Sequence, residues 1–246
     1  MTMAVRLAYS NTRYAAPPAR MAFAPTPNTR SSAAEPVTLL EHLRTSQPFA
    51  TRQTLARGQS VFSEGDSTDQ VFELVSGTVR ITKLTPGGRR HILDFIMPGE
   101  LFGLIEHAEH TTNAECVGEV VVISYSRSQL DKLTAVDPVV RRRVLQAVSD
   151  SLLTAQQQQL ILGCQDAREK LATFFLRLAD RTQLKPGNRL ELPMGRQDIA
   201  DHLGLTIETV CRTVRAMHRA GIVTVPNVHE MTLSNIAALR ALAVEI

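Results

Sequence analysis

Residues 196–217, RQDIADHLGLTIETVCRTVRAM, restrict the fold more than any other stretch of the chain. They predict two short helices that cross, because a small residue, Ala200, is followed four residues later by Gly204, which can form the turn. Thr206 is a suitable N-cap for the second helix. Apolar residues on the inner faces would hold the helices together: Ile199, Leu203, Leu205, Ile207, Val210, Val214 and Met217. The stretch is therefore interpreted as a helix-turn-helix.

The second helix of this unit, the recognition helix, would carry a polar outer face. Its apolar positions recur at i, i+4 and i+7, so the positions between them point outward. Arginine can bind guanine O6 and N7 with two hydrogen bonds, and glutamate can accept one from cytosine N4. A solvated helix could carry any one of these charges, but together with the packing pattern they favour DNA recognition. The predicted DNA-binding residues are Arg196, Thr206, Glu208, Thr209, Cys211, Arg212 and Arg215.

The charge balance places a basic region in the same part of the chain. The formal net charge is only +3, which does not by itself indicate a nucleic-acid partner. Between Arg168 and Arg219, however, ten Lys and Arg residues stand against six Asp and Glu residues. A local excess of this kind suits binding to phosphates.

The remainder of the 246-residue chain has room for a second modest domain. From about Leu55 to Tyr125, short apolar runs such as VFELVSG, TVRITKL, HILDFIM and VGEVVVISY alternate with glycine-containing turn signals. Strands spaced in this way predict an antiparallel roll or barrel, with TPGG at residues 85–88 as a hairpin tip. We assign residues 39–136 to this domain.

A long helix is predicted over residues 137–163. Asp137 is an acidic N-cap, and Pro138 takes the first helical position. Six residues then recur at alternating intervals of three and four, as in a two-stranded coiled coil. A helix packed on its own domain would need a wider apolar stripe, so this narrow seam favours a dimer contact. The predicted dimer-interface residues are Leu145, Val148, Leu152, Ala155, Gln159 and Leu162.

Residues 164–246 are predicted to form a winged helix-turn-helix domain. DAREKLATFFLRLADR places Leu171, Phe174, Phe175 and Leu178 on one face of a helix. LKPGNRLELP is interpreted as a turn and a short strand. GIVTVPNVHEMTLSN, after the recognition helix, is typical of two short strands around a turn, which would be the wing.

Residues 1–38 are predicted to be a disordered tail. The first 35 residues contain four arginines and a single acidic residue, with Ala, Pro, Ser and Thr between them. Such a composition cannot bury enough apolar surface to fold. No stretch has the length and hydrophobicity of a signal peptide or a membrane span, so we expect a cytoplasmic protein without a membrane partner.

The cysteines and histidines indicate neither a cofactor nor a catalytic centre. Cys116, Cys164 and Cys211 are far apart and odd in number, which fits a reducing compartment better than a disulfide framework. Cys116 and Cys164 are interpreted as packing residues. His107 and His110 lie three apart in a polar loop and are interpreted as solvated, so no metal is predicted. Because no nucleophile–base pair is found, an enzyme is not expected.

A β-roll, a dimerising helix and a winged helix-turn-helix, in this order, resemble the CRP/FNR family of transcription regulators from about Leu39 to Leu242. The resemblance implies an α+β fold with an N-terminal antiparallel β-roll like that of cyclic-nucleotide-binding domains. Glu208, Cys211 and Arg212 resemble the E-x-x-S-R set of the FNR branch. Cysteine stands at the serine position, which is similar to the FixK subgroup.

The same resemblance implies a function. It implies a homodimer that binds double-stranded DNA at a palindromic promoter site of the TTGA-N6-TCAA type and recruits RNA polymerase as an activator. Glu208 and Arg212 would lie at the C·G pair, and Cys211 would lie near the thymines. The TPGGRR hairpin corresponds to a surface that activates transcription in the family.

Two departures from the family pattern narrow the choice of effector. FNR proteins carry an N-terminal cysteine cluster for an iron–sulfur centre, but this chain has no cysteine before Cys116. Relatives that bind cyclic AMP pair a Gly-Glu with a downstream Arg-Ser/Thr, whereas this chain keeps Gly99 and Glu100 but has Thr112 and Asn113 at the second position. Without the guanidinium a cyclic phosphate loses its charge-assisted partner. Neither cofactor is predicted; the alternative is a β-roll that binds another small molecule.

Cys211 is open to two interpretations. It is either a small neutral substitute for serine or an oxidation-sensitive thiol. Arg212, Arg215 and the N-terminal end of the helix favour the thiolate, and Glu208 opposes them. Oxidation would fix a negative charge on the surface that meets DNA phosphates, and a disulfide between two proteins would block the same surface by bulk.

Overall fold

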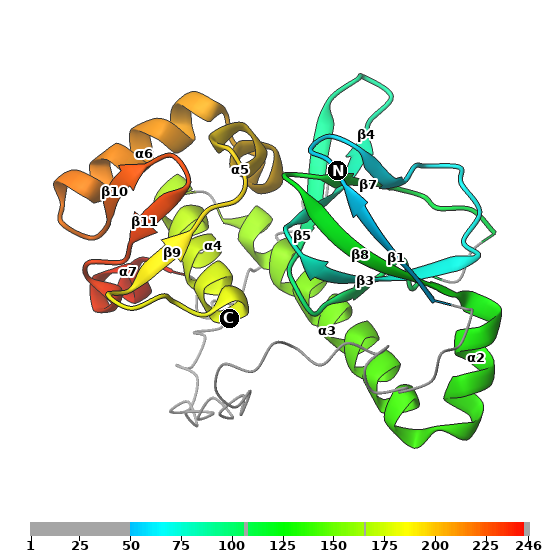
Figure 1. The fold of residues 1–246 in the computed structure, drawn as a ribbon. Helices are drawn as coiled ribbons and strands as arrows, with labels where there is room; N and C mark the ends of the chain where they lie inside the picture. The colour runs from blue at the N-terminus through cyan, green and yellow to red at the C-terminus, as the bar shows by residue number, and fades with distance from the viewer. Residues whose placement is uncertain (1–49, 106–107, 165, 244–246) are drawn as a thin grey trace, which may run out of the picture. The chain divides into compact units, whose positions relative to one another are not determined.

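The computed structural model describes residues 50–105, 108–164 and 166–243, all of which fall within one compact unit (Figure 1). The predicted tail over residues 1–38 and His107 lie outside the described residues. Among the described helices, none is long and apolar enough to cross a membrane.

Two four-stranded antiparallel sheets form the N-terminal β-roll. One has the strand order β1 (Ala50–Leu55), β8 (Val120–Ser126), β3 (Gln70–Ser76), β6 (Leu101–Phe102). The other has the order β2 (Ser60–Phe62), β7 (Asn113–Cys116), β4 (Val79–Leu84), β5 (Arg90–Ile96). The turn between β4 and β5 closes at TPGG, where the Gly88 amide donates to the Thr85 carbonyl at 2.8 Å. The predicted hairpin tip is therefore present.

Both faces of β3 are buried, so apolar residues occur on both sides of this strand, and Glu73 between them is buried and accepts a hydrogen bond from the Tyr125 hydroxyl at 2.7 Å. Phe72 and Leu74 point into the interior of the roll, while Val71 packs in a second cluster with Leu130 and Val140 of the following helices. A strand covered on both sides lacks the solvent-exposed polar face that would give a simple alternation of apolar and polar residues.

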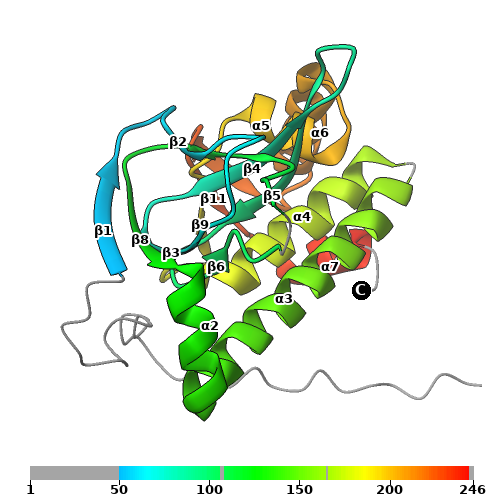
Figure 2. The same cartoon turned by 90° about the vertical axis from the view of Figure 1, so that its right-hand side faces the viewer.

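Two helices follow the roll and form a helical hairpin (Figure 2): α2 (Arg127–Val136) and α3 (Pro138–Gly163). The start of α3 is the predicted one, since the Asp137 carboxylate accepts hydrogen bonds from the amides of Val139 and Val140 at 2.8 and 3.3 Å. Val140, Gln158 and Ile161 are buried on the side of α3 that faces the rest of the chain. The sequence did not predict α2.

The C-terminal domain combines four helices with a small antiparallel sheet. The helices are α4 (Ala167–Thr182), α5 (Arg196–Leu203), α6 (Ile207–Arg219) and α7 (Ile236–Leu242). The sheet order is β10 (Thr224–Asn227), β11 (Glu230–Thr232), β9 (Arg189–Glu191), so both predicted wing strands are present. The predicted apolar face of α4 is buried in the core of this domain. The whole architecture confirms the α+β fold.

This core continues into the edge of the β-roll. The buried cluster formed by α4, α5 and α6 also contains Ile92 and Phe95 of β5, Met97 directly after that strand, and Val117 directly after β7. Figure 1 shows β5 and the β4–β5 hairpin beside α5. The roll and the C-terminal domain thus share apolar packing.

Candidate nucleic-acid interface

The turn between α5 and α6 has the backbone geometry that the glycine predicted. Gly204 has φ 64° and ψ 36°, in the left-handed region where glycine carries no steric penalty. The amide of Leu205 donates to the carbonyl of Ala200 at 3.0 Å, and Ala200 is fully buried where the helices meet. The crossing angle of the two helices is therefore set by this turn and by the small side chain beside it.

Helix α6 begins at its predicted cap and is fixed on the domain by its inner face. The Thr206 hydroxyl accepts a hydrogen bond from the Thr209 amide at 3.2 Å. Val210, Val214 and Met217 are buried beneath the helix. These contacts leave the opposite side of α6 free to face a partner.

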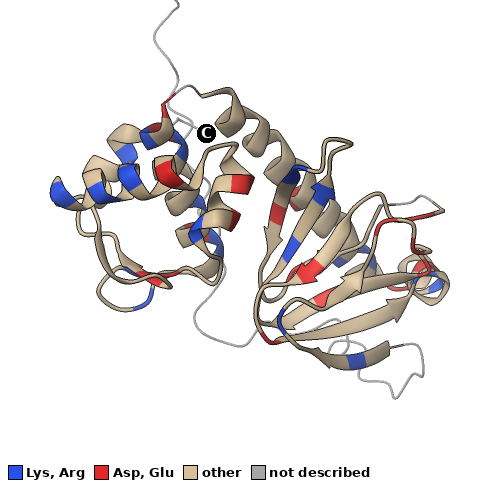
Figure 3. Ribbon diagram, turned by 90° about the horizontal axis from the view of Figure 1, so that it is seen from above, with Lys and Arg blue, Asp and Glu red and all other residues tan. Residues whose placement is uncertain are grey.

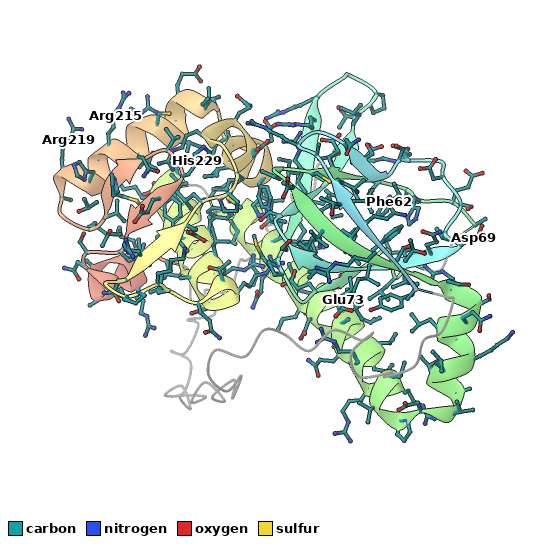
Figure 4. All side chains as sticks on the ribbon, in the orientation of Figure 1. Phe62, Asp69, Glu73, Arg215, Arg219 and His229 are labelled. Atoms are coloured by element: carbon teal, nitrogen blue, oxygen red, sulfur yellow. The ribbon has the colours of Figure 1, made fainter. Side chains whose placement is uncertain are left out.

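The predicted recognition residues occupy that opposite side. Glu208, Arg212 and Arg215 are exposed, and Cys211 between them is half-buried. Basic positions recur along α6 (Figure 3), and Arg215 and Arg219 project from it into solvent (Figure 4). Arg219 was not among the predicted residues, although it continues the i, i+4, i+7, i+11 spacing from Glu208.

The local environment keeps Glu208 suited to accept hydrogen bonds. A hydrogen bond from its own backbone amide, followed by one from the Thr206 hydroxyl, lowers the pKa of this carboxyl below its ordinary value. The carboxylate is therefore ionised at neutral pH, as acceptance from an amino group on a base requires.

Arg196, the first residue of α5, lies close enough to Cys211 of α6 for the two groups to interact electrostatically. Burial lowers the pKa of Arg196, and the nearby Cys211 partly offsets this effect. The Nη1 of Arg196 is buried and has no hydrogen-bond partner among the described residues. Buried donors in folded proteins nearly always have a partner, so Arg196 carries a hydrogen-bonding group that the described residues leave unused.

The six predicted dimer-interface residues form a strip along α3 that the described chain does not cover. All six are exposed, with Leu145 and Leu152 each 60% exposed. The side of α3 that packs on its own chain carries Val140 and Ile161 instead. The seam is thus separate from the intramolecular contact of the helix.

The segment that would bind a cyclic phosphate in related proteins is engaged in other contacts. Gly99 has φ +86°, as a turn residue. The Glu100 carboxylate accepts hydrogen bonds from the Met97 amide at 3.0 Å and from Arg181 of α4 at 2.7 and 3.2 Å. Asn113 accepts from the Glu64 amide at 2.9 Å. Glu100 therefore connects the roll to the C-terminal domain.

The interpretation of His110 as a solvated residue is wrong. Its ring stacks on Phe62 with centroids 3.7 Å apart and is buried. Burial and the neighbouring Arg127 lower the pKa of His110, and Asp66 opposes them. Across the described residues there is no group of three or more His, Cys, Asp or Glu that could hold a metal ion.

Two of the cysteines occupy structural positions. Cys116 is buried in the interior of the β-roll, and this burial raises the pKa of its thiol. Cys164 follows the last turn of α3, where its thiol donates to the Leu160 carbonyl at 3.3 Å. Cys211 alone among the three lies on the face of α6 that carries the predicted recognition residues.

Comparisons with known proteins agree with this architecture. The Crp-like helix-turn-helix domain family matches residues 169–242, and the cyclic nucleotide-binding domain family matches residues 52–137. The nitrogen fixation regulation protein FixK of Azorhizobium caulinodans is 35% identical over 244 residues, which cover 96% of this chain and 98% of the relative. The chain belongs to the CRP/FNR family of transcription regulators.

This CRP/FNR regulator is similar to FixK proteins in particular. FixK of Bradyrhizobium diazoefficiens is 35% identical over 185 residues, 74% of this chain and 78% of the relative. The structure of FixK2 from Bradyrhizobium japonicum matches with a TM-score of 0.75 at 34% identity, covering 80% of this chain and 98% of that chain. The CRP/FNR regulator binds DNA through its helix-turn-helix domain and is not an enzyme.

Proposed function

We propose that this regulator is a homodimeric activator that binds a TTGA-N6-TCAA-type palindrome without cyclic nucleotide or iron–sulfur cluster. The observation that carries the proposal is the exposed pair Glu208 and Arg212, one turn apart on a helix whose other side is buried. An ionised carboxylate and a guanidinium at this spacing suit the cytosine N4 and the guanine O6/N7 of a C·G pair.

The exposed strip on α3 supports the proposal of a dimer. Single scattered apolar residues on a surface need no explanation, but five exposed apolar residues that share a heptad register with Gln159 along one helix do. A second copy of the chain supplies the same strip by two-fold symmetry, which also matches the symmetry of a palindrome.

The absence of a cyclic nucleotide is supported by the contacts of Glu100. A ligand that needed this carboxylate would have to displace Arg181, which also pairs with Asp94 at 2.9 Å. The alternative is a small molecule that binds elsewhere in the β-roll. Purified protein that binds its palindrome only after a ligand is added would favour this alternative.

Base recognition is tested by Arg212→Ala. The variant should lose about 1–3 kcal/mol of binding free energy on the palindrome and lose its preference for the G·C pair of each half-site. The measurement is a binding titration on the palindrome and on versions with that pair inverted. An equal loss on specific and scrambled DNA would place Arg212 at a phosphate only.

We further propose that oxidation of Cys211 abolishes DNA binding. Two equivalents of peroxide convert the thiol to a sulfinate and release two waters, and the half-buried sulfur then carries a fixed negative charge. Its position among Arg196, Arg212 and Arg215 supports the proposal, because the new charge would compete with DNA phosphates for these cations. A neutral role as a serine substitute is the competing interpretation.

Peroxide treatment of matched variants separates the two interpretations. Cys211→Ser and Cys211→Ala should bind DNA and keep binding after peroxide, whereas Cys211→Asp should fail to bind. Cys164→Ser is the control, since it removes a thiol at the C-terminal end of α3 rather than on the outer face of α6 and should remain peroxide-sensitive. If Cys211→Ala loses binding under peroxide as fully as the parent, Cys211 is not the sensitive group.

A further inference from the structure

Two arginines of the β4–β5 hairpin form ion pairs with the first helix of the helix-turn-helix. Arg90 donates to Asp201 at 2.6 and 2.9 Å and to Asp198 at 2.9 Å. Arg80 donates to Asp198 at 3.0 Å and also holds Glu115 at 2.9 Å. We call the contacts of Arg80 and Arg90 with Asp198 and Asp201 the hairpin–α5 ion pairs.

These pairs are shielded from solvent. The side chains of Asp198 and Asp201 are only 11% and 16% exposed, and that of Arg80 is 19% exposed. Burial opposes the charge of Arg90, but Asp201 and Asp198 outweigh it and raise the pKa of this guanidinium. Partly buried pairs are screened by salt much less than exposed ones, so they can hold two elements together in solution.

The two aspartates that accept these hydrogen bonds lie on α5, the first helix of the helix-turn-helix. Asp198 also accepts a hydrogen bond from the Gly195 amide at the start of α5. His202, one turn on, contacts the Ile92 carbonyl of β5 through Nδ1 at 3.0 Å. Because the tight turn at Gly204 joins α5 to α6, a shift of α5 on the hairpin would also move the recognition helix.

A second ionic contact fixes the same domain at α4. Arg181 donates to Asp94 at 2.9 Å, to the Phe95 carbonyl at 2.7 Å and to Glu100 at 2.7 Å. The carboxylate that belongs to the phosphate-binding segment in cyclic-nucleotide binders thus contributes to the domain contact here. Contacts at both α4 and α5 leave the domain little freedom to rotate on the roll.

We propose that Arg80 and Arg90 are positioning residues that hold α6 in its DNA-binding position on the β-roll without any effector. The proposal rests on the palindromic site proposed above. In a TTGA-N6-TCAA site the half-site centres lie about ten base pairs, one helical turn, apart. A recognition helix held rigidly on each protomer favours that one spacing, whereas a freely moving one adapts to several.

Spacer length therefore distinguishes positioning from general stability. We would measure dissociation constants for palindromes with spacers of five, six and seven base pairs, with no ligand added. Arg90→Asp places a carboxylate against Asp198 and Asp201 and should weaken binding to the six-base-pair site by roughly tenfold, within the range of couplings between contacting residues. Binding to the other two spacers should change far less, so the preference for six shrinks.

Two further variants serve as controls. Arg89→Asp makes the same charge change at the exposed neighbouring position in the hairpin and should keep the parent preference. The double variant Arg90→Asp with Asp201→Arg reverses one pair and should recover most of the spacer preference. An equal loss on all three spacers, or the same behaviour for Arg89→Asp and Arg90→Asp, overturns the proposal.

Unfolding experiments keep this test separate from the choice of DNA site. A double-mutant cycle in urea with Arg90→Ala and Asp201→Ala should show a coupling of roughly tenfold in the unfolding equilibrium constant. If the parent protein does not prefer the palindrome but this coupling is present, the proposed palindromic DNA site is wrong. The hairpin–α5 ion pairs are then still supported. If the coupling is absent, the hairpin–α5 ion pairs do not hold the domain, and the positioning proposal is overturned.

Discussion

Leu152→Glu tests the dimer contact at the middle of its predicted seam. Leu152 is 60% exposed, so it contributes little to the folding of its own chain and most of its apolar surface is available to a partner. In a parallel two-helix contact the residue lies close to its own symmetry mate, so the variant brings two carboxylates together. We expect a monomer that is still folded.

The size of the effect follows from the exposed fraction. Complete burial of a leucine side chain stabilises by about 1.5–3 kcal/mol, so burial of the exposed part contributes about 1–2 kcal/mol per chain and about 2–4 kcal/mol per dimer. Since 1.4 kcal/mol corresponds to a factor of ten, the dimer dissociation constant should rise by roughly 30- to 700-fold. Repulsion between the two glutamates adds to this factor.

Analytical ultracentrifugation over a range of concentrations measures the dissociation constant, and circular dichroism checks that the variant is folded. Leu153→Glu is the matched control, because Leu153 is 53% exposed but lies one residue outside the heptad positions. We expect it to remain dimeric. A Leu152→Glu protein that stays dimeric while Leu153→Glu dissociates would show that the seam is placed on the wrong side of α3.

Two further predictions concern ligands and pH. Cyclic AMP or cyclic GMP at millimolar concentration should leave the melting temperature unchanged, because a ligand bound to the folded state would raise it by mass action; a clear thermal shift would contradict the interpretation of Glu100 and Thr112. Burial lowers the pKa of His202 to about 4, so below pH ~6.5 the unfolded chain takes up a proton at this residue that the folded chain does not. The free energy of unfolding should therefore fall by up to ~1.4 kcal/mol per pH unit between pH ~6.5 and ~4 in urea titrations, and a slope that His202→Asn leaves unchanged would assign the effect to other groups.

The elements in which apolar residues recur at a regular spacing could be predicted from the sequence. Elements of only a few residues could not. The helix-turn-helix, α3 and the β4–β5 hairpin each carry a cap, a glycine or a repeated apolar spacing that acts locally. Strand β6 has two residues and β2 has three, too few to show any alternation. Helix α2 packs only Leu130 and the partly buried Leu133 against the core, and this pair is too short a pattern to predict a separate helix.

For the site, the sequence predicted which residues lie on the outer face of one helix. It could not predict which residues of two different elements contact each other. The outward positions of α6 follow from helical spacing alone. The proximity of Arg196 to Cys211 depends on how two helices cross, and the pairing of Arg90 with Asp201 joins positions 111 apart in the chain. His110 was misjudged for the same reason, because its stacking partner Phe62 lies in a distant strand.

Selection of binding sites from a pool of random DNA duplexes by the purified, ligand-free protein tests the central claim most directly. We predict enrichment of a palindrome with TTGA and TCAA half-sites separated by six base pairs, with the G·C pair of each half-site invariant. Enrichment of a different or non-palindromic sequence, or enrichment only after a small molecule is added, would contradict the account.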